Sequence, residues 1–367
     1  MLDCVILGGG IIGLALAWEL TRAGQRVAVV DRPANSTIAS WAAGGILPPP
    51  ASRALHDPLE CLRTYSHSLY PSWCEELTRS SDTEVELFRC GGLYLGRSAG
   101  ERVALEAARV QWQDDGVRVE TWDRDEVQRR EPNLGPLPAS TRILYLPDEM
   151  QVRPSRILRA LRIALQRADV PLLAATWNGQ FQQEGTRWTS IQTERGELAA
   201  RAFCVTAGPW SGELLQSLGH DLPIEPRRGQ MLLWKLPAPA LQHVVNEGPR
   251  YLIARRDGHL LAGSTVEETG FVNETTVAGL RELAQFAEQL LPAVRELTPV
   301  ANWSGLRPMT SDGLPYLDAL PGWKNAFLAA GHFRSGIHLA PATARLMAAR
   351  MLERPTELDL RPFALAR

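Results

Sequence analysis

Lysine is nearly missing from this chain of 367 residues, although basic residues are common. Of its 39 basic residues only Lys235 and Lys324 are lysines, and the others are arginines. An enzyme that forms a Schiff base on lysine therefore has two candidates here, and the phosphate-binding loop ending in Gly-Lys-Ser/Thr is absent. The arginines form no basic stripe along the sequence, so it does not indicate a nucleic-acid-binding protein.

Cysteine pairs and long apolar runs are also absent. The five cysteines are odd in number and show no Cys-x-x-Cys spacing, which indicates neither a disulfide framework nor a metal site and favours a reducing compartment. The apolar stretch from Cys4 to Trp18 follows Asp3 instead of a basic region, unlike a signal peptide, and is too short to span a bilayer. We therefore expect a globular, cytoplasmic protein without a membrane span.

The first thirty residues carry a pattern typical of dinucleotide-binding proteins. A short apolar run leads into Gly8-Gly9-Gly10-Ile11-Ile12-Gly13, an apolar helix follows, and a second strand ends at Asp31. In such a site Gly8 permits the tight turn, Gly10 lets the backbone approach a pyrophosphate, and Gly13 allows close packing of helix on sheet. The helix N-terminus favours the phosphates, and Asp31 is placed to accept hydrogen bonds from ribose hydroxyls.

This fingerprint does not distinguish FAD from NAD, so an NAD-dependent dehydrogenase stays an alternative at this point. The segment Ala39-Ser40-Trp41-Ala42-Ala43-Gly44-Gly45-Ile46 is rich in small residues. Such a segment would let the backbone lie against a flat cofactor, or it is simply a loop.

The remaining chain alternates between helical and strand patterns. The periodicity predicts helices over 55–77, 101–113, 154–168, 277–291 and 336–352, and strands within 86–95, 203–207, 224–262 and 326–330. We interpret residues 144–148 as the end of an irregular stretch. Parallel α/β segments thus stand at the start, near 154–208 and at the end, with antiparallel material between them. Because a single core rarely grows beyond about 250 to 300 residues, we expect two discontinuous domains.

Taken in order, these segments resemble the D-amino-acid-oxidase-like FAD oxidoreductases, and within them the glycine oxidase branch. The most specific stretches are 303–308 continuing to 312–315, and 330–337 continuing to 340–343. The resemblance implies an α/β (α+β overall) fold in which an FAD-binding Rossmann-like (GR2-type) domain joins a discontinuous antiparallel-sheet substrate domain. The expected ranges are 1–80, 145–215 and 300–367 for the first domain, and 81–144 and 216–299 for the second.

The resemblance also implies the cofactor and its contacts. No cysteine lies near Met309 to form a covalent flavin link, so we expect non-covalent FAD. The expected FAD contacts are Gly8, Gly10, Ile11, Ile12, Gly13, Asp31, Arg32, Ala39, Ser40, Gly44, Gly45, Ile46, Ala207, Gly208, His332, Phe333, Arg334, Ser335, Gly336, Ile337 and His338.

For the substrate, the resemblance implies that Arg307 pairs with a carboxylate, with Tyr251 and Arg334 nearby. A guanidinium suits this role because its planar fork can form two parallel hydrogen bonds to a carboxylate. We expect no catalytic side chain, because hydride passes from the substrate carbon to the flavin. Two departures from the branch, Pro249 and Val266, are expected near the pocket and bear on substrate size.

The expected reaction is oxidation of glycine or another small amine or D-amino acid by oxygen, with a possible place in thiamine biosynthesis and a possible homo-oligomer. Three alternatives remain open. A D-amino-acid or sarcosine-type dehydrogenase would pass its electrons to an acceptor other than oxygen. A flavoprotein without catalytic activity would serve in assembly or sensing, and an NAD-dependent dehydrogenase would hold no flavin.

Overall fold

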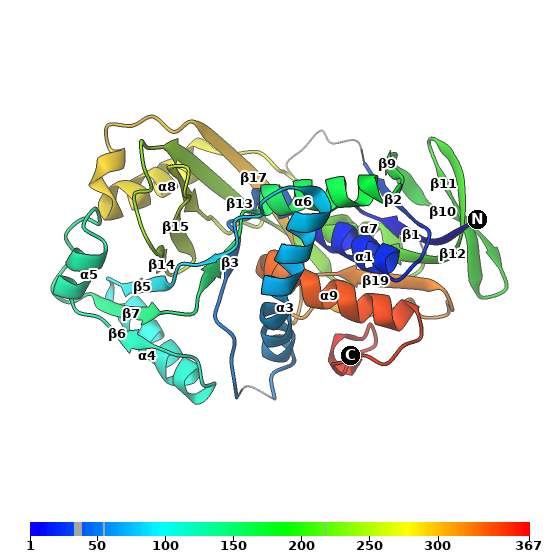
Figure 1. Cartoon of the computed structure of the whole chain (residues 1–367), viewed down its shortest axis with the longest axis horizontal. Helices are drawn as coiled ribbons and strands as arrows, with labels where there is room; N and C mark the ends of the chain where they lie inside the picture. Colours follow the sequence, from blue (N-terminus) through cyan, green and yellow to red (C-terminus); the bar gives the residue numbers. More distant parts are fainter. Residues whose placement is uncertain (33–38, 54–55, 217) are drawn as a thin grey trace.

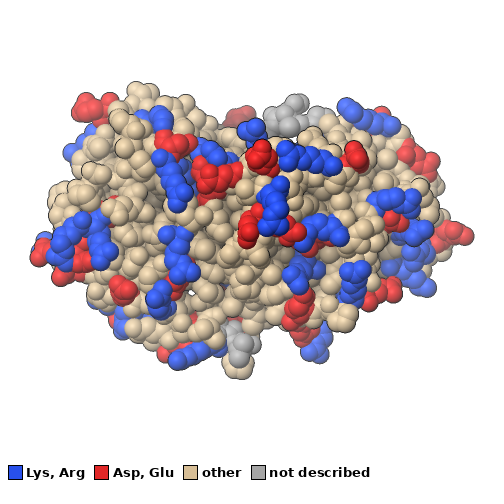
Figure 2. Space-filling view, viewed as in Figure 1, with Lys and Arg blue, Asp and Glu red and all other residues tan. Residues whose placement is uncertain are grey.

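The computed structural model describes residues 1–32, 39–53, 56–216 and 218–367. Two eight-stranded sheets form the two ends of an elongated molecule, with a layer of helices over the first sheet (Figure 1). None of the helices in these described ranges is long and apolar enough to cross a membrane. Basic and acidic side chains alternate over the face seen in Figure 2.

The first sheet is the Rossmann-like part of the molecule. Its strand order is β10 (Trp177–Glu184), β11 (Arg187–Thr193), β12 (Gly196–Val205), β1 (Leu2–Leu7), β2 (Val27–Asp31) and β9 (Leu172–Ala174), and β19 (Ala326–Ala330) pairs with β12 and with β18 (Tyr316–Ala319). Strands β1, β2, β9, β12 and β19 run parallel, so their carboxyl ends meet at one edge. In parallel α/β sheets ligands bind at that edge.

Four helices share an apolar core with this sheet: α1 (Ile11–Arg22), α3 (Pro58–Ser81), α6 (Pro154–Arg167) and α9 (Gly336–Met351). Helix α1 is apolar almost all round because it is buried against the sheet, α6 and α9. Helix α3 begins at its N-cap Asp57, whose carboxylate accepts hydrogen bonds from the Leu59 and Glu60 amides.

The second sheet is antiparallel apart from one pair. Its strand order is β17 (Ala301–Thr310), β13 (Ile224–Lys235), β16 (His259–Gly263), β15 (Arg250–Ala254), β14 (Val244–Glu247), β5 (Gly92–Gly96), β7 (Arg142–Leu146) and β6 (Glu120–Thr121), and only β14 and β5 run parallel. Alternate residues such as Leu232, Trp234 and Leu252 pack under α8 (Val277–Leu290). Their neighbours, including Met231 and Tyr251, lie on the opposite face.

The remaining elements include one small sheet and several helices. A three-stranded sheet joins β3 (Ile46–Leu47), β8 (Met150–Gln151) and β4 (Phe88–Arg89), and the remaining α-helices are α2 (Ala39–Ala42), α4 (Ala99–Asp114), α5 (Arg124–Arg130) and α7 (Ser211–Gln216). Four 3-10 helices complete the described chain: η1 (Gly208–Trp210), η2 (Pro292–Val294), η3 (Phe333–Ser335) and η4 (Arg361–Phe363).

The expected α/β class with a Rossmann-like sheet and a second, largely antiparallel sheet is confirmed. Most predicted helices and strands are present, but residues 142–146 form β7 where we expected irregular chain. Helix α3 begins at Pro58, and the expected start at Leu55 lies outside the described residues. The domain ranges stay a prediction. Residues 301–310, which that prediction assigns to the FAD-binding domain, form β17 and pair with β13 in the second sheet.

Candidate active site

A long cavity of about 1870 Å³ lies between the two sheets. It is lined by the carboxyl ends of β1, β2 and β12, by the first turns of α1 and α9, and by the inner face of the second sheet. Pockets for drug-sized ligands span about 300 to 1,000 Å³. The cavity therefore has room for a dinucleotide and a small substrate together.

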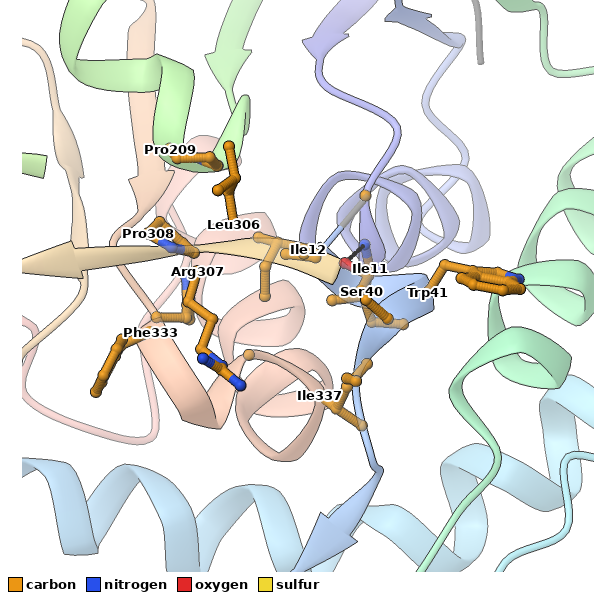
Figure 3. Close-up of a pocket in the computed structure, with 18 of the residues that line it drawn as sticks. Ile11, Ile12, Ser40, Trp41, Pro209, Leu306, Arg307, Pro308, Phe333 and Ile337 are labelled. Atoms are coloured by element: carbon orange, nitrogen blue, oxygen red, sulfur yellow. Dashed lines mark hydrogen bonds between the residues drawn. The ribbon is translucent and has the colours of Figure 1, made fainter. Parts of the chain in front are cut away.

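Two glycines of the turn at the start of α1 have no space for a side chain. Gly8 has φ +128°, and a Cβ atom placed on it would overlap the Thr206 carbonyl. A Cβ atom on Gly13 would overlap the Gly8 carbonyl oxygen, so this glycine lets α1 pack against the turn. The Ile11 amide donates to the Ser40 hydroxyl at 3.0 Å (Figure 3). The other amides of the first turn have no partner within the helix and are available to an anion.

The acidic residue that ends β2 lies beside an arginine from α6. Arg162 donates to the Gly9 carbonyl at 3.2 Å and lies 4.0 Å from the Asp31 carboxylate. Arg32 stacks on the Trp210 ring, with its guanidinium carbon 3.8 Å from the ring centroid. Asp31, Arg32, Arg162 and Trp210 all line the cavity. This end of the cavity thus offers both a hydrogen-bond acceptor for hydroxyls and cations for phosphates.

A buried arginine holds the small-residue segment that the sequence analysis singled out. Arg255 donates to the Gly44 carbonyl at 2.5 Å, to the Val152 carbonyl at 2.9 Å and to the Gln151 side chain at 2.7 Å. Its burial lowers the pKa of Arg255 to about 10, so it stays charged at neutral pH. The segment is therefore held in place as one wall of the cavity. It is more than a loop, since residues 39–42 form α2 and 46–47 form β3.

The opposite wall comes from the C-terminal segment around α9. His332 and His338 are buried, and burial lowers the pKa of each to about 3, so both are neutral at physiological pH. The His332 Nε2 atom lies 3.1 Å from the Thr343 hydroxyl. These histidines line the cavity as uncharged groups, which suits contact with a ring and not proton transfer.

Arg307 on β17 is a further cation that lines the cavity. Its guanidinium donates to the Ser264 hydroxyl at 2.7 Å and to the Thr265 carbonyl at 3.2 Å, and desolvation lowers its pKa. In Figure 3 it extends on one side of β17, while Leu306 extends towards Pro209 on the other. None of the ion pairs within the described ranges includes Arg307.

Two further predicted residues surround Arg307. The Tyr251 hydroxyl lies 3.6 Å from the Met231 sulfur, and the ring of Tyr251 packs so close to Gly44 that a Cβ there would approach it to 2.9 Å. Arg334 is exposed and donates to the Pro249 carbonyl at 3.0 Å. The site therefore presents one sheltered cation, one tyrosine and one cation at the cavity rim.

Comparison with known proteins agrees with this geometry. A family model described as FAD dependent oxidoreductase (DAO) matches residues 3–350. A glycine oxidase of Pseudomonas aeruginosa is 36% identical over 364 residues, which cover 99% of this chain and 98% of the relative. The chain belongs to the DAO family of FAD-dependent oxidoreductases.

Solved structures of relatives share the whole fold of this oxidoreductase. The crystal structure of glycine oxidase from Geobacillus kaustophilus superposes with a TM-score of 0.93 at 31% identity, covering 100% of this chain and 98% of the other. An iminodiacetate oxidase from Chelativorans sp. BNC1 superposes with a TM-score of 0.88 at 25% identity, covering 99% and 98%. The enzyme is thus an FAD-dependent, glycine-oxidase-like oxidoreductase.

The fold brings the predicted site residues of this oxidoreductase together around one cavity. All of them line it except Gly13, which packs α1 against the glycine turn. Of the two departures, Pro249 lines the cavity, whereas Val266 is exposed and does not line it, although it directly follows Thr265, whose carbonyl accepts from Arg307. The contacts with FAD and substrate themselves stay predictions.

Sequence reasoning missed several residues of the oxidoreductase site. Arg159 and Arg162, three positions apart on α6, both line the cavity, and that spacing on an amphipathic helix was the only available signal. Gly229 and Arg255 gave no local signal, because their roles depend on strands that are distant in sequence.

Proposed function

We propose that this oxidoreductase oxidises glycine, or another small D-amino acid or amine that carries a carboxylate, with oxygen as the electron acceptor. The observation that carries the proposal is the Arg307 guanidinium, a sheltered cation that forms no ion pair with the acidic residues the structure describes, in the same cavity as a dinucleotide-binding glycine turn. The balanced reaction converts amino acid, oxygen and water into oxo acid, ammonia and hydrogen peroxide.

The residues present fit non-covalent FAD. The glycine turn has no room for a Cβ at Gly8 or Gly13, and the first-turn amides of α1 face the cavity that would take the pyrophosphate. Asp31 would bind the adenosine ribose, and Arg162 would add charge near the phosphates. The neutral histidines His332 and His338 would lie along the ring. When bound, FAD supplies the two-electron oxidation of the substrate carbon.

Arg307 positions the substrate in this proposal. Ser264 and the Thr265 carbonyl occupy part of the guanidinium and hold its orientation, and the remaining N–H groups bind the substrate carboxylate. Tyr251 forms the adjacent wall. The substrate amine must be neutral at the moment of reaction. Because His332 and His338 are buried and weakly basic, the amine releases its proton to solvent before it binds.

The oxidase test uses the purified protein with its bound flavin. Glycine, sarcosine and D-alanine are each added without oxygen, and bleaching of the oxidised-flavin absorption is measured. Peroxide formation and dye reduction are then compared in air. Bleaching with peroxide release supports the oxidase; bleaching with dye reduction only would establish the dehydrogenase alternative. Absence of bleaching by all three amines would overturn the proposed substrate class.

The Arg307→Ala variant tests the carboxylate contact separately. We expect kcat/KM for glycine to fall about 10- to 100-fold or more, because a hydrogen bond to a charged group contributes about 1.5–3 kcal/mol. An unchanged apparent affinity for amino acids would show that the carboxylate binds elsewhere. A role in thiamine biosynthesis is a further proposal that rests on the family resemblance, and the gene neighbourhood tests it.

A further inference from the structure

A row of polar side chains crosses the second sheet on its cavity face. Tyr94 on β5 pairs directly with Asn246 on β14, and Asn246 pairs directly with Tyr251 on β15. Directly opposed residues point to the same face of a sheet, and all three line the cavity. Since neighbouring strands lie about 4.7–4.9 Å apart, Tyr94 is about 10 Å from Tyr251. The row therefore leads away from the site around Arg307.

Glu149 places its carboxyl on the same face of the sheet, beside this row, and is fully buried. Its carboxyl group accepts hydrogen bonds from the Tyr94 hydroxyl at 2.5 Å and from the Asn246 side-chain amide at 3.3 Å. The carboxyl occupies the space over Gly92, where a Cβ atom would overlap it. The backbone carbonyl of Glu149 is also fixed, because it accepts from the Gly91 amide at 2.9 Å. The carboxyl position is thus determined by the sheet.

No cationic side chain among the described residues forms an ion pair with this buried carboxyl. None of the ion pairs in the described part of the chain involves Glu149. Desolvation raises the pKa of Glu149 to about 7, and the bonds from Tyr94 and Asn246 only partly oppose that increase. A buried carboxylate with two neutral donors is electrostatically unsatisfied and favours a nearby positive charge.

The two donors decide what the cavity wall can bind. Tyr94 has a single O–H group, and it is used by Glu149. Asn246 directs its NH2 group at Glu149, because a carboxylate oxygen can only accept there. The groups left over are acceptors: the second lone pair of the Tyr94 oxygen and the Asn246 carbonyl oxygen. An N–H donor on a ligand complements both.

We propose that Tyr94 and Asn246, with Glu149 as a positioning residue beside them, form a second subsite that binds an amine or ammonium group of the ligand. This inference rests on the proposed function in that Arg307 holds the carboxylate at the other end of the same ligand. The preferred substrates or inhibitors are then amino acids that carry a second nitrogen away from the carboxylate.

The test measures binding and needs no turnover. The affinities of 4-aminobutanoate, 5-aminopentanoate and 6-aminohexanoate for the flavin-loaded protein are measured by calorimetry at pH 8. Each is compared with the unsubstituted carboxylate of the same chain length. At the best-fitting length we expect the amine to increase affinity about 10-fold or more, the effect of a hydrogen bond to a charged group.

Variants test whether the gain in affinity from the amine comes from Tyr94 and Glu149. Tyr94→Phe and Glu149→Gln should each remove most of the difference between amine and unsubstituted ligand. Tyr145→Phe is the matched control, because it removes a hydroxyl from β7 at a position that does not line the cavity, and should keep the difference. A second readout compares kcat/KM for D-ornithine and D-norvaline, whose ratio should fall in the same two variants.

Each outcome has a definite meaning. An amine that gives no gain in affinity at any chain length, or a gain that survives in Tyr94→Phe, overturns the second subsite. If this occurs while glycine still bleaches the flavin, the proposed function stands. Conversely, carboxylates that bind equally well to Arg307→Ala and to the parent overturn the carboxylate contact. The affinity difference between amine and unsubstituted ligands then still tests the second subsite by itself.

Discussion

The guanidinium of Arg307 occupies the space that a side chain on Gly229 would fill. A Cβ atom at position 229 would overlap both terminal nitrogens of the arginine. The two residues lie on paired strands, β13 and β17, whose register places Gly229 opposite Gly305. The position of the proposed carboxylate-binding group therefore depends on the absence of one methyl group on the neighbouring strand.

Gly229→Ala is expected to displace the Arg307 guanidinium and to weaken carboxylate binding. Loss of one hydrogen bond to a charged group corresponds to a fall of about 10- to 100-fold in kcat/KM for glycine. Steady-state kinetics measures this effect. Gly100→Ala in α4 is the control, because a Cβ there meets no atom within 4 Å. Unchanged kinetics in Gly229→Ala would mean that the arginine adopts another productive position.

Arg255→Met is expected to weaken FAD retention and lower stability. Removing the guanidinium leaves the Gly44 and Val152 carbonyls without their buried donor, and each unsatisfied buried group costs about 1–3 kcal/mol. Urea unfolding measures the stability, and the released flavin after gel filtration measures retention. Arg256→Met is the control for loss of one arginine, because Arg256 is the next residue in the chain but is exposed and stacks on the Phe88 ring. Full flavin retention in Arg255→Met would contradict the role of this wall.

Tyr70→Phe is expected to destabilise the first turn of α9. Pro341 lacks the amide hydrogen that would bond the Ile337 carbonyl, and the Tyr70 hydroxyl from α3 donates to that carbonyl instead. Ser66 similarly donates to the His338 carbonyl at 2.6 Å. We expect the free energy of unfolding to fall by about 1–3 kcal/mol, the cost of an unsatisfied buried acceptor.

Chemical denaturation measures the effect of Tyr70→Phe, with Tyr145→Phe as the comparison because Tyr145 is only half-buried. Equal stability of the two variants would show that water or a shift of α9 satisfies the Ile337 carbonyl.

The stability of the protein should depend on the ionisation of Glu149. Its pKa is raised to about 7 in the folded state, so the stabilisation that protonation provides is complete below the unfolded pKa of about 4.3 and is lost as the pH rises through about 7. Glu149→Gln stays neutral at every pH. Its free energy of unfolding relative to that of the parent should therefore increase between pH 5 and pH 8, by on the order of 1–3 kcal/mol.

Urea unfolding of both proteins at pH 5 and pH 8 gives this difference directly. Glu296→Gln removes an exposed carboxylate and should show no comparable gain. A constant stability difference between Glu149→Gln and the parent across this pH range would contradict the buried, titrating carboxyl.

Much of the nucleotide end could be predicted from the sequence because its determinants are local. Gly13 lacks a side chain for a local reason, since a Cβ there would overlap the Gly8 carbonyl oxygen, and β2 ends at Asp31 as its pattern indicates. Pro154 begins α6 because its fixed φ and missing amide hydrogen suit a first helical turn. Arg307 was found through a motif on its own strand.

Other parts of the site were decided only by the tertiary structure. Gly229 matters because β13 pairs with β17, and Arg255 matters because its hairpin reaches the Gly44 carbonyl, more than two hundred residues earlier in the chain. Glu149 acquires its raised pKa from burial beside two strands that are nearly 150 residues apart. The sequence by itself determined the local turns, caps and periodicities; long-range strand pairing and burial determined which polar groups share the cavity, because neither leaves a periodic signal along the chain.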